Sequence, residues 1–253
     1  MNSVGVRRME WQDYADELID VLDLEGSPVA VTYSMRAPSG AVEGRHRVCK
    51  ALLAARGGEV IDLTAESSSC PGGTWHLGLG EAPTGERARG FKEFLVDGEK
   101  LFCSISTLHR AHDLAVDPPL GLAEHVVLSP LGQAEFEPDA VVFICSAEQA
   151  CRVVTLDEYE TGKPPRTEMI GATCQQVITY PVVKGELNVS LMDYTTRHIR
   201  GYRPGDCVVT VPYHRIHGVM RSVPHCTAGR AEAEVPESFQ DELDEGAQEE
   251  LGL

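Results

Sequence analysis

The spacing of apolar residues predicts helices and strands in alternation along most of the chain. Between Trp11 and Leu24 apolar residues recur at helical spacing, which is typical of a helix with one buried face. Pro28 to Met35 is rich in β-branched residues and predicts a strand. Arg47 to Arg56 predicts a second helix, which two glycines close, and Val60 to Leu63 is a short strand candidate.

The second half of the chain continues this alternation. Val126 to Leu131 and Ala140 to Cys145 are apolar runs short enough to be buried strands, and a helix is expected from Ala147 to Tyr159. The remaining elements expected are a helical stretch at 172–179, strands at 188–192 and 207–211, and a short helix at 212–220. The pattern therefore predicts an α/β or α+β fold, with helices packed on a mixed β-sheet.

Length and charge suggest how the chain is divided. We expect residues 1–227 to form a single globular domain and residues 228–253 to form an acidic, disordered tail. The formal net charge is −17, and nine acidic residues with no basic one follow Arg230, which leaves −8 for the rest. Such a chain is a poor match for nucleic acid or for an anionic membrane surface, so neither is expected as a partner.

The sequence offers no segment typical of membrane insertion or export. No apolar run reaches the roughly 18–20 residues of a membrane-spanning helix. Met1 to Asp13 lacks the apolar core of a secretory signal. We therefore expect a cytoplasmic protein, and in that reducing compartment the eight cysteines are interpreted as thiols or ligands rather than disulfides.

Several common catalytic motifs are absent from the sequence. It contains neither the phosphate-binding G-x-x-x-x-G-K-[ST] pattern nor a G-x-G-x-x-G that follows a strong strand. The G-x-S-x-G pattern of many hydrolases is also missing. A Ser–His–Asp triad stays open, because its members need only meet in space.

Three cysteines carry the most chemical information. Cys70 lies in a run of serines and glycines that includes Gly72 and Gly73, Cys174 follows another run of small residues, and Cys49 lies on the second predicted helix. Small neighbours let backbone N–H groups approach a thiolate or a cluster sulfur. Taken singly, each cysteine is more often a small buried apolar residue.

A second group of potential metal ligands lies near the C-terminus. Imidazole and thiolate together suit zinc, although the closely spaced cysteine pair of most structural zinc sites is missing. Surface or substrate-facing histidines are therefore the more common interpretation of this group. Its members are Cys207, His214, His217, His225 and Cys226.

A set of short motifs follows one another in a recognisable order. They are PVAV at 28–31, Cys49 on its helix, CPGG at 70–73 with Gly78 behind it, LSPL at 128–131, PDAVV at 138–142, ATC at 172–174 and NVS at 188–190. In this order they resemble an uncharacterised archaeal and bacterial family, domain of unknown function 169. The resemblance extends over roughly residues 14 to 224, and the order of the motifs is more specific than any one of them.

The resemblance implies a metal centre with an incomplete set of cysteines. In the family a further cysteine often precedes an arginine that matches Arg197, and here Asp193 stands in its place. The ligands implied are Cys49, Cys70 and Cys174, with Asp193 as a weaker fourth ligand or an acid/base group. Four cysteines satisfy every iron of a [4Fe–4S] cluster, whereas three leave one iron open to a substrate.

The function expected is that of an iron–sulfur enzyme, an oxidoreductase or a lyase, that acts on a small molecule. Arg197 would bind an anionic group of the substrate, which its planar fork suits. Gly72 and Gly73 would let backbone approach the [4Fe–4S] cluster. A zinc enzyme or zinc-stabilised protein, a non-catalytic accessory module and a ligand-binding protein with structural thiols are the alternatives. A redox partner protein and self-association also stay open.

Overall fold

The core of the protein is one antiparallel β-sheet. A computed structural model describes residues 3–116, 118–165, 167–169 and 171–234. Within these residues six strands pair in the order β2-β3-β1-β4-β6-β5, and each neighbouring pair is antiparallel. The strands are β1 (Val29–Ser34), β2 (Ile61–Leu63), β3 (His125–Pro130), β4 (Ala140–Cys145), β5 (Asn188–Ser190) and β6 (Cys207–Pro212).

Strand β4 shows why the apolar runs are continuous rather than alternating. It is buried along its whole length. Successive side chains of a strand point to opposite faces of the sheet. Val141 and Phe143 therefore join the core on one face, while Val142 and Ile144 join the core on the other. Both faces of the sheet must be covered by helices, since full burial of such a side chain stabilises the fold by about 1.5–3 kcal/mol.

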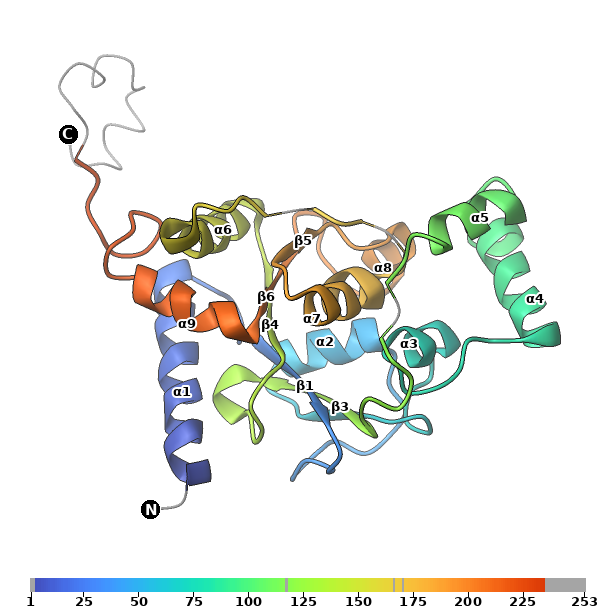
Figure 1. The fold of residues 1–253 in the computed structure, drawn as a ribbon, viewed down its shortest axis with the longest axis horizontal. Helices are drawn as coiled ribbons and strands as arrows, with labels where there is room; N and C mark the ends of the chain where they lie inside the picture. Colours follow the sequence, from blue (N-terminus) through green and yellow to red (C-terminus); the bar gives the residue numbers. More distant parts are fainter. Residues whose placement is uncertain (1–2, 117, 166, 170, 235–253) are drawn as a thin grey trace, which may run out of the picture.

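Three helices cover the first face, on the left of the sheet in Figure 1. Leu18, Leu156 and Ile216, one from each helix, are completely buried together against β4 and β6. These helices are α1 (Ser3–Leu22), α6 (Ala147–Thr161) and α9 (Tyr213–Ser222).

The start and end of α6 follow directly from its sequence. The Ser146 side chain accepts a hydrogen bond from the Gln149 backbone N–H, and the Gln149 side chain accepts one from the Ser146 backbone N–H. This reciprocal capping satisfies two N–H groups that the first turn leaves without partners. Gly162 ends the helix in the left-handed conformation, at φ 58°, which glycine adopts without steric cost.

The opposite face is covered by α2 (Val48–Arg56), η3 (Gln175–Thr179) and α7 (Tyr180–Lys184). Leu52 from α2 and Ile178 from η3 are completely buried against this face. The remaining elements lie beyond this layer or connect the strands. They are α3 (Pro71–His76), α4 (Gly85–Glu93), η1 (Phe94–Gly98), α5 (Ile105–His112), η2 (Leu131–Gln133) and α8 (Tyr194–Ile199). In Figure 1, α4 and α5 stand apart from the rest as an arm at the right.

The structure confirms the predicted class, in which helices pack on a β-sheet. The sheet is antiparallel throughout rather than mixed. In each neighbouring pair, the two strands run in opposite directions. Cys145, the last residue of β4, thus lies opposite Cys207, the first residue of β6, although a long connection separates them. Residues 173–179 of the predicted segment 172–179 are helical, with the wider turns of η3 from residue 175 onward.

Part of the predicted tail, residues 228–234, lies within the described residues. Its first residues are fixed to the domain, since Arg152 Nε donates to the Ala228 carbonyl at 2.9 Å. Arg230 forms ion pairs with Glu17 and Asp20 of α1. The rest of the predicted tail, from residue 235 onward, lies outside the described residues. In the part of the chain that is described, no helix is both long and apolar enough to cross a membrane.

Candidate functional site

One cavity of about 310 Å³ opens beside the α2 face of the sheet. Its walls come from the start of α2, from α3, from the arm formed by α4, η1 and α5, from the segment before η3, and from α8. Most of the wall is apolar. Set into it are the three cysteines that the sequence analysis singled out, Cys49, Cys70 and Cys174, together with Gly72 and Gly73.

Each of the three thiols comes from a different element. Cys49 lies in the first turn of α2, and its carbonyl accepts a hydrogen bond from the Tyr202 hydroxyl at 2.8 Å. Cys70 is the residue that precedes α3, and Cys174 immediately precedes η3. Cys174 is buried, while Cys49 and Cys70 are partly exposed. The fold therefore gathers thiols that are far apart in the sequence.

The loop that carries Cys70 is tied to the start of α2. The His46 N–H donates to the Ser67 carbonyl and the Ser69 N–H donates to the His46 carbonyl, each at 2.9 Å. Thr74 then holds the Cys70 carbonyl through its N–H at 2.9 Å and its hydroxyl at 3.0 Å. Because Cys49 lies only three residues after His46, these bonds bring the segment of Cys70 close to that of Cys49.

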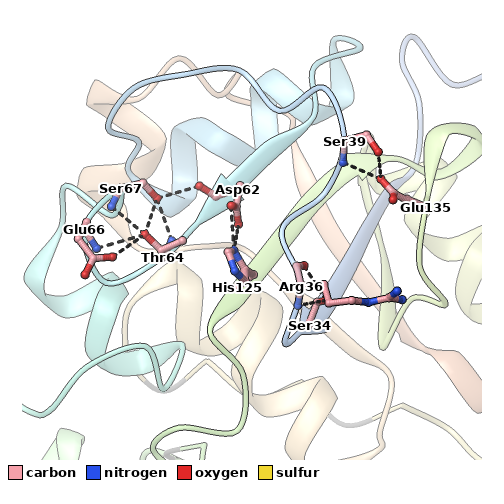
Figure 2. Close-up of polar contacts among 9 residues, drawn as sticks. All are labelled: Ser34, Arg36, Ser39, Asp62, Thr64, Glu66, Ser67, His125 and Glu135. Atoms are coloured by element: carbon pink, nitrogen blue, oxygen red, sulfur yellow. Dashed lines mark hydrogen bonds and ion pairs between the residues drawn. The ribbon is translucent and has the colours of Figure 1, made fainter.

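A polar turn anchors the other end of this loop, as Figure 2 shows. The Ser67 hydroxyl donates to the Asp62 carbonyl and accepts from the Thr64 N–H, both at 2.8 Å. The Asp62 carboxylate in turn holds Nδ1 of His125, on the neighbouring strand β3, at 2.9 Å. The turn thus connects the edge of the sheet to the segment that leads to Cys70.

Gly72 and Gly73 allow α3 to lie close to its neighbours. A Cβ atom on Gly73 would lie only 2.8 Å from Cγ2 of Val48, and one on Gly72 would lie 3.3 Å from Cζ of Phe91. Both glycines also line the cavity. Their small size therefore serves the packing of α3 against α2 and the arm, and it leaves backbone exposed to the cavity.

The surroundings of Cys49 and Cys174 favour the neutral form of these two thiols. Burial raises the pKa of Cys49, which the Arg200 charge opposes and Cys70 and Asp193 reinforce. Burial raises the pKa of Cys174 well above its usual range, and the neighbouring Cys70, Asp193 and Cys49 raise it further. Cys70 is thus close enough to Cys49 and Cys174 to influence their ionisation. A metal bound by them would displace protons, because thiolates are the ligand form.

Asp193 lines the cavity, but its carboxylate already has partners. Oδ2 accepts hydrogen bonds from the Thr173 N–H and hydroxyl and from the Thr196 hydroxyl, and Oδ1 accepts one from the Thr196 N–H. Asp193 therefore caps α8 and ties it to Thr173, the residue before Cys174. This arrangement leaves one lone pair of Oδ1 able to bind a ligand or a proton.

Arg197 does not line the cavity. Its guanidinium donates to the carbonyls of Leu191, Pro204 and Asp206, so it braces the loop after α8. Arg47 and Arg200 line the cavity instead. The sequence analysis did not single out Arg200. Arg200 rather than Arg197 reaches the cavity because α8 ends at residue 199, and the sequence did not predict where this helix ends.

Glu99 and His112, from the arm, are further titratable residues of the cavity wall. Burial raises the pKa of Glu99, and the Asp193 charge raises it further. Glu99 carries no signal in the sequence, because the arm contributes it from outside every matched motif.

The structure does not gather the Cys and His residues near the C-terminus. His217 Nδ1 is hydrogen-bonded to the Tyr14 hydroxyl at 2.9 Å, and Cys226 is buried in the core under α1, α6 and α9. Cys207 lies opposite Cys145 on the neighbouring strand. These residues occupy separate places on and around the first face of the sheet.

Among the described residues, no group of three or more His, Cys, Asp or Glu side chains is placed to hold one metal ion. A single zinc ion needs all its ligands within about 2.0–2.3 Å of one centre. In an iron–sulfur cluster, by contrast, each thiolate binds a different iron.

The fold and the cavity define a class of protein in which an antiparallel sheet, covered by helices on both faces, supports a thiol-lined cavity. The sequence profile of the uncharacterised family DUF169, described as "Uncharacterised ArCR", matches residues 17–222. The chain belongs to this family, which confirms the resemblance seen in the order of its motifs. An uncharacterized protein of Methanocaldococcus jannaschii, MJ0308, is 23% identical over 229 residues, which are 85% of this chain and 94% of that protein. No solved structure matches the chain significantly.

Proposed function

We propose that this protein binds a [4Fe–4S] cluster through Cys49, Cys70 and Cys174 and acts as an enzyme on a small molecule in the same cavity. The observation that supports the proposal is the meeting of these three thiols, from three separate elements, in one cavity. Soft thiolate ligands favour iron–sulfur clusters and zinc over calcium or magnesium. Three thiols that line one cavity could each bind a different iron of such a cluster.

The residues around the thiols suit such a group. Gly72 and Gly73 present backbone without side chains to the cavity, and hydrogen bonds from backbone N–H groups to sulfur tune the potential of a cluster. The apolar walls would keep water away from it, which also affects its potential. When bound by three cysteines, a cluster supplies one open iron that serves as a Lewis acid or passes electrons. Oxidoreductases and lyases both use such a centre, and they are the reaction classes proposed.

Asp193 acts in this proposal mainly as a positioning residue. It fixes Thr173 and therefore the backbone that carries Cys174. The remaining lone pair of Oδ1 would accept a proton or a weak metal bond at the cavity wall. Arg197 keeps the loop after α8 in place through three carbonyls. The substrate-binding role that was expected of Arg197 is instead proposed for Arg47 and Arg200, which line the cavity.

A cytoplasmic location agrees with this proposal, because a reducing compartment keeps the thiols available as ligands. The partner proposed is a small-molecule substrate, with a redox protein as the electron source if the reaction is an oxidoreduction. Neither nucleic acid nor a membrane is proposed as a partner, since the chain is strongly acidic.

The proposal is tested by removing one thiol and measuring bound iron. Cys70→Ser should lose most of the iron and sulfide of the anaerobically purified protein, because a hydroxyl is a poor ligand for a cluster iron. Cys151→Ser is the matched control, since Cys151 is exposed on α6 and lies outside the cavity. The control should keep its iron.

Full iron occupancy in Cys70→Ser would contradict the ligand assignment. Equal losses in both variants would also contradict it, because only one of the two thiols lines the cavity. Zinc in place of iron in the unaltered protein would instead support the zinc alternative at the same three thiols.

A further inference from the structure

The cavity carries two positive charges that the proposed ligand set does not use. Arg47 precedes α2 and Arg200 follows α8, and both line the cavity. Among the described residues, neither guanidinium forms a hydrogen bond or an ion pair. Arg215 and Arg221, by contrast, each bind a carboxylate through two nitrogens. A guanidinium that lines a mainly apolar cavity without a partner is suited to bind an anion from solution.

The nearby acidic groups do not neutralise these arginines fully. The Asp193 carboxylate is engaged by two threonines, as described above. Glu99 lies within the electrostatic influence of both Arg47 and Arg200, but among the described residues it forms no ion pair with either. The arginines therefore keep the capacity to attract a further anion.

The rest of the cavity is suited to an apolar body. Phe91, Phe94 and Phe102 from the arm face the cavity with Leu95, Leu101 and Met169. At about 310 Å³ the cavity is at the small end of ligand pockets, which favours a small molecule over a nucleotide or a peptide. An apolar surface beside two arginines indicates a ligand with one anionic end and one apolar end.

We infer that the cavity binds a small organic monocarboxylate, with its carboxylate on Arg200 and Arg47 and its apolar body against the phenylalanines of the arm. The inference rests on the proposed function only in that it places this molecule beside the three thiols as the substrate. Carboxylate binding itself needs the arginines and the apolar wall. It can therefore be measured separately from iron content.

The test compares carboxylates with neutral amides of the same shape. Hexanoate and phenylacetate are titrated calorimetrically into the anaerobically purified protein, followed by hexanamide and phenylacetamide. At least one acid should bind, and at least about tenfold more tightly than its amide, because charge-assisted hydrogen bonds are about twice as strong as neutral ones. Arg200→Ala should weaken binding of the acid by about tenfold or more and leave the amide unchanged.

Two further variants control for folding and for overall charge. Arg200→Lys keeps the charge and should keep part of the affinity, which a general loss of structure would not allow. Arg203→Ala removes an exposed arginine close in sequence, outside the cavity, and should leave carboxylate affinity unchanged. Failure of both acids to bind, equal affinity for acid and amide, or unchanged acid affinity in Arg200→Ala would each overturn the inference. Carboxylate binding by a protein that contains no iron would support this inference and contradict the proposed cluster. Failure of the carboxylate proposal can therefore be distinguished from failure of the cluster proposal.

Discussion

The cysteines of this chain differ sharply in their surroundings, although each is a single letter in the sequence. Cys103 and Cys151 are exposed, Cys49 and Cys70 line the cavity, and Cys145 is buried within β4. Burial, reinforced by the neighbouring Cys207, raises the pKa of Cys145 to about 12. An unfolded chain would leave the same thiol near its usual pKa of about 8.5.

This difference predicts that the metal-free protein loses stability in alkali. Between the pKa of the unfolded state and that of the folded state, the unfolded chain has released the Cys145 proton and the folded chain has not. The free energy of unfolding should therefore fall as pH rises from about 9 toward 12, by up to about 1.4 kcal/mol per pH unit for each such thiol. Urea unfolding at a series of pH values measures the slope.

Cys145→Ala and Cys151→Ala separate this effect from the titration of other groups. The first should flatten the alkaline slope by up to the contribution of one proton, and the second should leave it unchanged, because Cys151 is exposed. Identical slopes in the two variants would contradict the assignment to the buried thiol.

Asp193 and Arg197 show how far residue types alone could be interpreted. Asp193 was predicted to lie at the site, and it does line the cavity. Its spacing to Thr196, three residues on, also fits a helix cap, which the structure shows. Arg197 was expected to face the substrate, but it binds backbone carbonyls. The sequence could not decide between these roles, because both need the same donors and acceptors and only the loop geometry distinguishes them.

At the scale of elements, the main helices and strands followed from periodicity and caps. The apolar runs of β1, β3 and β4 and the stripes of α2 and α6 were predicted within a few residues of their observed bounds, whereas α1 begins at Ser3, eight residues before the predicted start. The short α3 was not predicted, because its sequence, PGGTWH, contains two glycines and a proline, which read as loop. It forms because Gly73 can approach Val48 of α2 more closely than any residue with a Cβ atom.

Two glycine substitutions should therefore have opposite effects. Gly73→Ala should lower the free energy of unfolding by about 1–3 kcal/mol, because the new methyl group would overlap the Val48 side chain. Gly90→Ala, within α4 and with nothing near its Cβ position, should leave stability unchanged or raise it by up to about 1 kcal/mol. Chemical denaturation of both variants gives the comparison. A stability loss of the same size in both would contradict the account of α3 packing.

At the scale of the whole molecule, the cavity is a product of the fold that no single segment encodes. Its walls come from segments near residues 49, 70, 100, 174 and 193. Periodicity predicts each element separately and says nothing of which ends meet. The motif order of the family pointed to the three cysteines before the structure brought them together. Arg200, Glu99 and the apolar wall of the arm could be found only from the structure.

The most direct test of this account is the metal content of the unaltered protein. It should be purified without oxygen, and its iron, acid-labile sulfide, zinc and visible spectrum should be measured per chain. The account predicts a brown protein with about four irons and four sulfides per chain, as a [4Fe–4S] cluster requires. A colourless protein, with no metal or with one zinc ion in place of iron, would contradict it.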